Sequence, residues 1–246
     1  MNLPISTPPL TQLGKRLTSL IRKANYDFSL FSSTDKILVA LSGGKDSLSL
    51  LYLLKGLVKQ GFPHLEISAC HVKGKYSCGA GVQESFIKAI CHRLSVPLYI
   101  KESNNNTDKL ECYSCSRNRR KLLFETAKEY GTQLVAFGHH RDDSIETLLL
   151  NLFHKGEFEA NLAKVPMIRY GVTIIRPLIY ASEDDIVQFA KQGGFSRITC
   201  QCPVGQNSKR KQVKQIIKEI EDAFPHVKKN LERSGLKYGL KKALSP

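Results

Sequence analysis

The sequence Lys36-Ile37-Leu38-Val39-Ala40-Leu41-Ser42-Gly43-Gly44-Lys45-Asp46-Ser47 runs directly into a leucine-rich, helix-periodic stretch that ends near Leu57. An apolar strand, a glycine turn and a helix therefore follow one another. Such a turn presents free backbone N–H groups at the positive end of a helix dipole, which is a favourable seat for phosphate. We therefore predict that residues 42–47 form a phosphate-binding loop.

Two common phosphate loops do not fit these residues. A Walker A loop needs Ser or Thr after its lysine and a glycine five residues before its last one, but Asp46 follows Lys45 and Val39 stands at the earlier position. A Rossmann site is disfavoured because no Gly-x-Gly-x-x-Gly follows the strand. The loop instead resembles the pyrophosphate-binding loop of enzymes that split ATP into AMP and pyrophosphate.

Length and composition limit the class of protein. The 246 residues, 41% of them hydrophobic, suffice for one large α/β domain with or without a small appendage. No apolar stretch approaches the roughly 18 residues of a membrane span, and the first residues lack signal-peptide features. We expect a cytoplasmic protein with no membrane partner. Its seven cysteines should then be reduced and serve metal binding or catalysis.

The chain is strongly basic, with a formal net charge of +15 and a pI near 9.5. Residues 208–246 alone hold eleven Lys or Arg against four Asp or Glu. Clustered cations bind backbone phosphates by releasing counterions, so the charge favours a polyanionic partner. A merely solvated helix face explains the same residues, and an acidic membrane surface is a weaker alternative.

Extended and helical patterns alternate along the chain, which predicts an α/β fold with a doubly wound parallel sheet of about five strands covered on both faces. The expected strands are 36–41, 65–72, 96–100, 133–138 and 172–176. The expected helices are 46–59, 83–94, 116–130, 144–153 and 183–191.

Three segments describe the expected organisation. Residues 1–33 form a lead-in with a helix over about 10–24, and residues 34–193 form the ATP-binding domain. Residues 194–246 form a cysteine-bearing loop and a basic helical extension. Its helix is expected over about 208–224, with Ser208 as N-cap. The apolar stripe of this helix consists of Val213, Ile216, Ile217 and Ile220.

The fourth expected strand ends in Gly138-His139-His140-Arg141-Asp142-Asp143, with Glu146 and Thr147 one turn further on. Ligands of a doubly wound sheet bind at the carboxyl ends of its strands, where this segment should meet the loop 42–47. Paired carboxylates beside phosphate suit Mg²⁺, and Asp46 is a further ligand candidate. The alternative is that Asp142 and Asp143 only cap a helix and complement its dipole.

Two cysteine pairs indicate a metal site. Cys112-Tyr-Ser-Cys115 precedes a helix, and Cys200-Gln-Cys202-Pro follows much later. Three or four thiolates suit a structural zinc or an iron–sulfur cluster, and a bare thiol pair is a further alternative. We expect Cys70 and Cys91 in the core. The neighbouring basic residues suit ATP phosphates, an RNA backbone or plain solvation; they are Arg117, Arg119, Arg120 and Lys121.

Together these motifs, in this order over roughly residues 20–225, resemble the tRNA 2-thiocytidine synthetase family. The phosphate loop and the Gly138–Thr147 motif are shared with other pyrophosphate-loop enzymes such as lysidine synthetases. The Cys112-x-x-Cys115 pair narrows the choice among these enzymes to the cluster-dependent sulfur carriers. The resemblance implies an adenine nucleotide alpha hydrolase-like fold, a [4Fe–4S] cluster bound by three cysteines, ATP with Mg²⁺, and a cytidine in the tRNA anticodon loop, at position 32.

The resemblance also implies residue roles. The pyrophosphate half of ATP would lie on Ser42, Gly43, Gly44, Asp46 and Ser47, with Lys45 and Arg119 counted among the ATP-binding residues. His71 and Gly138 would border the nucleoside. Asp142 or Asp143 would hold Mg²⁺ or position the reacting carbonyl, which makes both, with Asp46, the catalytic candidates. Cys112 and Cys115 would bind the cluster. The third ligand is Cys202, from the Cys-Pro step, or alternatively Cys200.

The implied reaction is coherent. Attack of the cytidine C2 carbonyl oxygen on the α-phosphate would form an adenylate and release pyrophosphate, and sulfur would then displace AMP. A tRNA sulfurtransferase of this kind needs a sulfur donor such as a cysteine desulfurase. A homodimer is compatible with the sequence. The alternatives are a thiouridine synthase or lysidine synthetase-like enzyme of the same fold, and a zinc-stapled, non-catalytic RNA-binding module.

Overall fold

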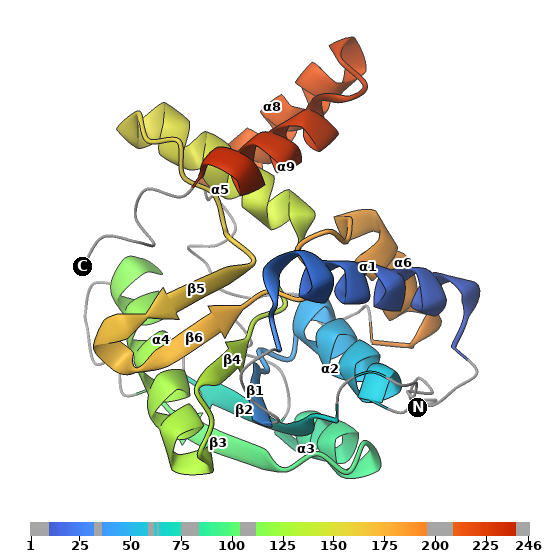
Figure 1. Ribbon diagram of the computed structural model, residues 1–246, viewed down its shortest axis with the longest axis vertical. Helices are drawn as coiled ribbons and strands as arrows, with labels where there is room; N and C mark the ends of the chain where they lie inside the picture. The colour runs from blue at the N-terminus through green and yellow to red at the C-terminus, as the bar shows by residue number, and fades with distance from the viewer. Residues whose placement is uncertain are drawn as a thin grey trace.

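The described residues of the chain, in a computed structural model, are 10–31, 36–58, 62, 64–74, 84–103, 112–195 and 209–239, with the backbone alone for 112–115. Their strands form one sheet in the order β3-β2-β1-β4-β6-β5 (Figure 1). Every pair is parallel except β5 with β6. The strands are β1 Lys36–Ala40, β2 Glu66–Lys73, β3 Leu98–Glu102, β4 Leu134–Ala136, β5 Lys164–Met167 and β6 Val172–Ile175.

All the expected helices are present within the described residues. They are α1 Gln12–Phe28, α2 Lys45–Val58, α3 Glu84–Arg93, α4 Cys112–Tyr130, α5 Arg141–Lys155, α6 Glu183–Gln192 and α8 Lys209–Ala223. A further helix, α9 Val227–Tyr238, and a short 3₁₀ turn at Ile168–Tyr170 were not expected. None of the described helices combines the length and apolar character needed to cross a membrane.

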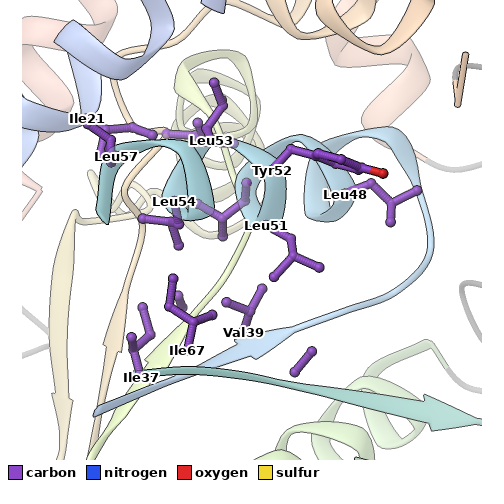
Figure 2. Packing of buried hydrophobic residues seen from close by; sticks show 14 of the residues in the cluster. Ile21, Ile37, Val39, Leu48, Leu51, Tyr52, Leu53, Leu54, Leu57 and Ile67 are labelled. Atoms are coloured by element: carbon purple, nitrogen blue, oxygen red, sulfur yellow. The ribbon is translucent and has the colours of Figure 1, made fainter. Parts of the chain in front are cut away.

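The sheet is covered on both faces, which confirms the doubly wound fold. Alternate residues of β1 belong to two separate cores: Ile37 and Val39 face the core under α1, α2, α3 and α6, whereas Leu38 and Ala40 face the core under α4. Figure 2 shows Leu51 and Leu54 of α2 lying over the strand residues of the first core. This two-sided burial follows from the period of two along a strand and explains why β1 is apolar throughout.

The edge strand β5 was missed because its sequence is a poor strand signal. It contains Pro166, which cannot donate a ladder hydrogen bond and is therefore confined to sheet edges. Gly171, with a φ of 61°, turns the chain back into β6 and makes the pair antiparallel. The expectation of about five parallel strands thus stands, with one antiparallel strand added.

The N-terminal helix packs on the main core. Leu17, Ile21 and Ala24 of α1 are fully buried in the same cluster as the leucines of α2. Residues 1–9 and 32–33 of the expected lead-in, and the cysteine loop from residue 196 through Ser208, lie outside the described residues.

At the C-terminus, α8 and α9 pack against α5 on the side of the molecule where α5 extends beyond the sheet (Figure 1). Ile145 and Leu149 of α5 contact Val213 and Ile217 of α8 in a small separate core. Of the expected apolar stripe, Ile216 is instead 37% exposed. The basic helix is therefore attached to the helix that opens with the Asp142-Asp143 pair.

Candidate functional site

The site lies where the strand order reverses. The chain runs outward from β1 through β2 to β3 and returns to β4 on the other side of β1. The carboxyl ends of β1 and β4 therefore diverge into neighbouring loops, which is the ligand position of open α/β sheets. The first loop is Ser42–Ser47 and the second is Gly138–Asp143.

The first loop is held by its own serines. The hydroxyl oxygens of Ser42 and Ser47 lie 3.0 Å apart, the Gly44 amide donates to Ser42 Oγ at 3.3 Å, and Ser47 Oγ donates to the Gly44 carbonyl at 3.0 Å. Gly43 has a φ of 84°, which a residue with a side chain rarely adopts. The loop therefore needs glycine for its shape, and it leads directly into the N-terminus of α2.

The two loops touch at Gly138. A Cβ on this residue would lie 2.8 Å from the carbonyl carbon of Asp46 and 2.9 Å from the Ser47 amide nitrogen. Glycine is required because the backbones approach too closely for any side chain. This contact fixes the Gly138–Asp143 segment against the phosphate loop.

Lys45 is held by carboxylates from two elements. Its Nζ lies 2.9 Å from Asp46 Oδ1 and 3.5 Å from Glu183 Oε1, at the start of α6. Burial opposes the charge of Lys45, but the two carboxylates outweigh it and raise its pKa. Glu183 also pairs with Lys214 of α8. Burial opposes ionisation of Glu183, but Lys214 and Lys45 lower its pKa. Charge at the phosphate loop is thus linked to the basic helix α8.

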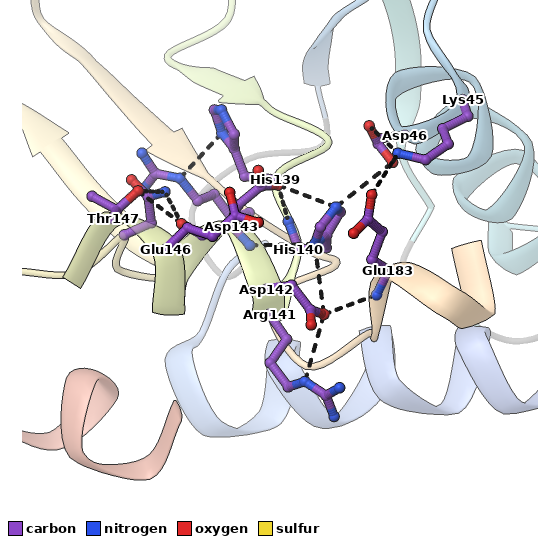
Figure 3. A network of polar contacts seen from close by, with 12 residues as sticks. Lys45, Asp46, His139, His140, Arg141, Asp142, Asp143, Glu146, Thr147 and Glu183 are labelled. Carbon is purple, nitrogen blue, oxygen red and sulfur yellow. Dashed lines mark hydrogen bonds and ion pairs between the residues drawn. The ribbon is translucent and has the colours of Figure 1, made fainter. Parts of the chain in front are cut away.

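The second loop opens α5 with a capping box (Figure 3). His140 Nδ1 accepts from the Asp143 amide at 3.4 Å, and Asp143 Oδ2 accepts from the His140 amide at 3.0 Å. His140 Nε2 also lies 3.7 Å from Asp46 Oδ1. Asp142 is directed elsewhere, because its Oδ2 accepts from the Glu183 amide at 2.9 Å. Asp143 and Asp46 therefore both lie near His140, whereas Asp142 is held by the backbone at the start of α6.

Asp143 and Glu146 share one cation. Arg210 of α8 lies 3.3 Å from Asp143 Oδ1 and 3.6 Å from Glu146 Oε2. Burial opposes ionisation of Asp143, but His140 and Arg210 lower its pKa. Burial raises the pKa of Glu146 to about 7 against the opposing charge of Arg210. The pair thus combines one ionised carboxylate with one that titrates near neutrality.

A neutral histidine lies behind this pair. Arg176 Nε donates to His139 Nδ1 at 3.4 Å, and its NH1 group donates to the Leu162 carbonyl at 2.6 Å. Burial and the charge of Arg176 lower the pKa of His139 to about 3, so its ring is uncharged at neutral pH. His139 also stacks on Phe137. These contacts hold His139, and with it the backbone of the Gly138–Asp143 loop, in place.

Known proteins of similar sequence identify the family of this chain. The PP-loop domain model matches residues 9–220. A tRNA-cytidine(32) 2-sulfurtransferase of Pelobacter propionicus is 34% identical over 229 residues, which are 89% of this chain and 84% of the relative. The protein of that name from Bartonella tribocorum is 36% identical over 239 residues, 93% of this chain and 82% of the relative. The chain belongs to the tRNA 2-thiocytidine synthetase family of PP-loop proteins.

A solved structure supports the family's fold in this chain. The U34-tRNA thiolase NcsA of Methanococcus maripaludis, with its [4Fe–4S] cluster, superposes with a TM-score of 0.73 at 22% identity. The alignment covers 91% of this chain and 77% of that one. At this identity the likeness establishes the shared architecture alone.

His71 and Arg119, both predicted to bind ATP by the family resemblance, lie at the carboxyl end of β2. The His71 ring is buried, its Nδ1 lies 2.8 Å from the Leu41 carbonyl oxygen, and burial lowers its pKa. The neutral ring therefore holds the backbone of Leu41, the residue that precedes the phosphate loop. Arg119 NH2 donates to the Val72 carbonyl at 3.2 Å, which holds α4 to the end of β2.

The cysteines of the family motif are described only in part. Cys112 and Cys115 form the first turn of α4, which follows β3. Like the phosphate loop, α4 therefore comes after the carboxyl end of a parallel strand. Their side chains, together with Cys200 and Cys202, lie outside the described residues. Cys70 and Cys91 are buried as expected, and burial raises their thiol pKa values to about 11 and about 12. Among the described residues, no group of three or more His, Cys, Asp or Glu forms a ready metal site.

Three contributors to the site were missed by sequence reasoning. Glu183 was treated only as a helix start, Arg210 as one of many basic residues, and Arg176 as the end of a strand. Each reaches the site from a segment distant in sequence. A sequence signal existed only for Arg210, whose spacing from Val213 and Ile217 places it beside the apolar stripe that packs on α5.

Proposed function

We propose that the chain is an ATP-dependent tRNA sulfurtransferase that replaces the C2 oxygen of cytidine 32 in the anticodon loop with sulfur. The observation that carries the proposal is the contact of Gly138 with Asp46, which builds one site from the phosphate loop and the family's second motif. The names of the relatives, at 34–36% identity over most of both chains, support the substrate class.

The chain's own residues would act first on ATP. Loop amides and the N-terminus of α2 would bind the pyrophosphate portion, and Lys45 would compensate its charge. The cytidine C2 oxygen would attack the α-phosphate and release pyrophosphate, and sulfur would then displace AMP. Mg²⁺ would be held by Asp46, whose side chain is 34% exposed beside the loop, and by Asp143, which like Asp46 lies near His140 Nε2.

A [4Fe–4S] cluster fits the backbone placement of the cysteine motif. Cys112 and Cys115 are one helical turn apart at a helix N-terminus, where thiolates are favoured. Cys202, or alternatively Cys200, would be the third ligand. When bound, the cluster would supply the sulfur for displacement of AMP. The tRNA would bind to the basic surface that includes α8, in the cytoplasm, with sulfur delivered by a donor such as a cysteine desulfurase.

Anaerobic purification followed by iron, sulfide and tRNA measurements tests this function. We expect about four irons per chain, and mass spectrometry should show 2-thiocytidine at position 32 missing from a deletion strain. Asp46→Ala and Cys112→Ala should each abolish complementation. Thiolated uridine, lysidine, or full thiolation by a zinc-only protein would contradict the proposal. Intact tRNA binding with no ATP consumption would favour the RNA-binding module instead.

A further inference from the structure

Two cations of α8 face the carboxylates of the site. Arg210 contacts Asp143 and Glu146, and its NH2 group also donates to Thr147 Oγ1 at 3.2 Å. One turn later, Lys214 pairs with Glu183, which in turn contacts Lys45. The helix thus supplies one partner to the first turn of α5 and another to the start of α6.

From these contacts we propose that Arg210 is a positioning residue of the active site, so that the basic helix α8 is a working part of the ATP site. This inference rests on the proposed function. Arg210 acts through Asp143: it holds the carboxylate that neighbours the phosphate loop in one orientation.

Packing alone does not explain the guanidinium. Val213 and Ile217 already attach α8 to α5 through an apolar contact. The side chains of Asp143 and Glu146 are only 18% and 8% exposed, and two such carboxylates one turn apart repel each other. A guanidinium spans both groups with a fixed fork, which a lysine cannot reproduce. Removing it leaves the carboxylates free to adopt other orientations.

The adjoining face of the same helix is available to RNA. Lys211 and Lys218 are exposed and have no ion pair within the described part of the chain. With Lys214 they line a cleft of about 560 Å³ whose other wall includes Glu146 and Glu183. RNA phosphates held by these lysines would keep α8 against α5, and so would keep Arg210 on Asp143. Docking of RNA and arrangement of the carboxylates would therefore be linked.

The test compares Arg210→Gln, Arg210→Lys and Arg210→Gly in the full chain. Lys88→Gln is the matched control, because Lys88 is an exposed cation of α3 paired with Glu84. The readouts are RNA-dependent pyrophosphate release, as kcat and as KM for tRNA, and thermal stability. We expect Arg210→Gln to lower kcat by at least tenfold with less than a threefold change in KM, Arg210→Lys to retain an intermediate kcat, and guanidinium ion to restore part of the Arg210→Gly rate.

Three results would overturn the inference. A higher KM with unchanged kcat would make Arg210 an RNA contact. Equal loss of stability and rate in both Arg210→Gln and Arg210→Lys, without guanidinium rescue, would make it a fold anchor. Wild-type kcat, KM and thermal stability of Arg210→Gln would show that Arg210 does not position the site. Thiolation of cytidine is followed separately: pyrophosphate release with another base modified would contradict the proposed function alone, and a wild-type chain that consumes no ATP would contradict both.

Discussion

At the scale of single residues, the site depends on the absence of one side chain and the burial of another. Gly138 allows the two loops to meet, because any Cβ would overlap the backbone of Asp46. Glu146 is buried beside Asp143 and has a pKa of about 7. Both features have consequences that can be measured.

We predict that Gly138→Ala separates the two loops. The overlap at 2.8 Å should destabilise the fold by about 1–3 kcal/mol and weaken ATP binding by at least tenfold. Calorimetric titration with ATP and thermal unfolding measure the two effects. Gly131→Ala is the control: Gly131 has a φ of 78° but open space around its Cβ position, so this change should add strain without weakening ATP binding. Equal ATP affinity in both variants would contradict the role of the loop contact.

We predict that Glu146 makes stability fall as pH rises. Its folded-state pKa of about 7 lies above the ordinary value of 4.5, so the folded protein binds the extra proton. The stabilising contribution is complete below about pH 4.5 and is lost as the pH rises through about 7, with an upper limit of about 3 kcal/mol. Urea unfolding of the wild type and Glu146→Gln between pH 5 and 8 measures it. A difference between the two that stays constant over this range would show that Glu146 does not titrate as described.

At the scale of elements, α8 is attached to α5 by a small apolar contact. Only Val213 and Ile217 of α8 are buried there, whereas the neighbouring Ile216 is 37% exposed. So small a core makes the attachment sensitive to single substitutions.

We predict that Ile217→Ala loosens α8 at a cost of about 2 kcal/mol, near the lower end for Ile→Ala because the cluster is peripheral. Hydrogen exchange of the α8 amides should become faster while the amides of β1 and α2 stay protected. Ile216→Ala removes the same atoms from an exposed position and should change neither. If the two variants exchange alike, the contact does not hold the helix.

At the scale of the whole molecule, charge is distributed to suit a polyanion. The net charge is +15, and α8 extends its exposed lysines beside the cleft that borders the site. Electrostatic binding of this kind responds to ionic strength through counterion release.

We predict that Lys211→Gln and Lys218→Gln each weaken tRNA binding and each reduce the slope of log K against log salt by about 0.7–0.9, as expected for one lost phosphate contact. Filter binding across a salt series measures both. Lys88→Gln lowers the net charge equally but lies on α3, so an unchanged slope is expected for it. A uniform effect of all three substitutions would indicate a response to net charge and not to a defined surface.

The sequence by itself determined the strand–loop–helix unit over residues 36–57 and the family, because the phosphate loop and its flanking elements are contiguous and their periodicities are local. It also predicted the doubly wound sheet, but not β5, whose proline hides the strand pattern, or α9. Only the tertiary structure decided which side chains share the site. Gly138 meets Asp46, Glu183 reaches Lys45 and Arg210 reaches Asp143, because the strand order places β4 beside β1 and α8 packs back on α5. Contacts between segments this far apart arise from packing, which no local pattern encodes.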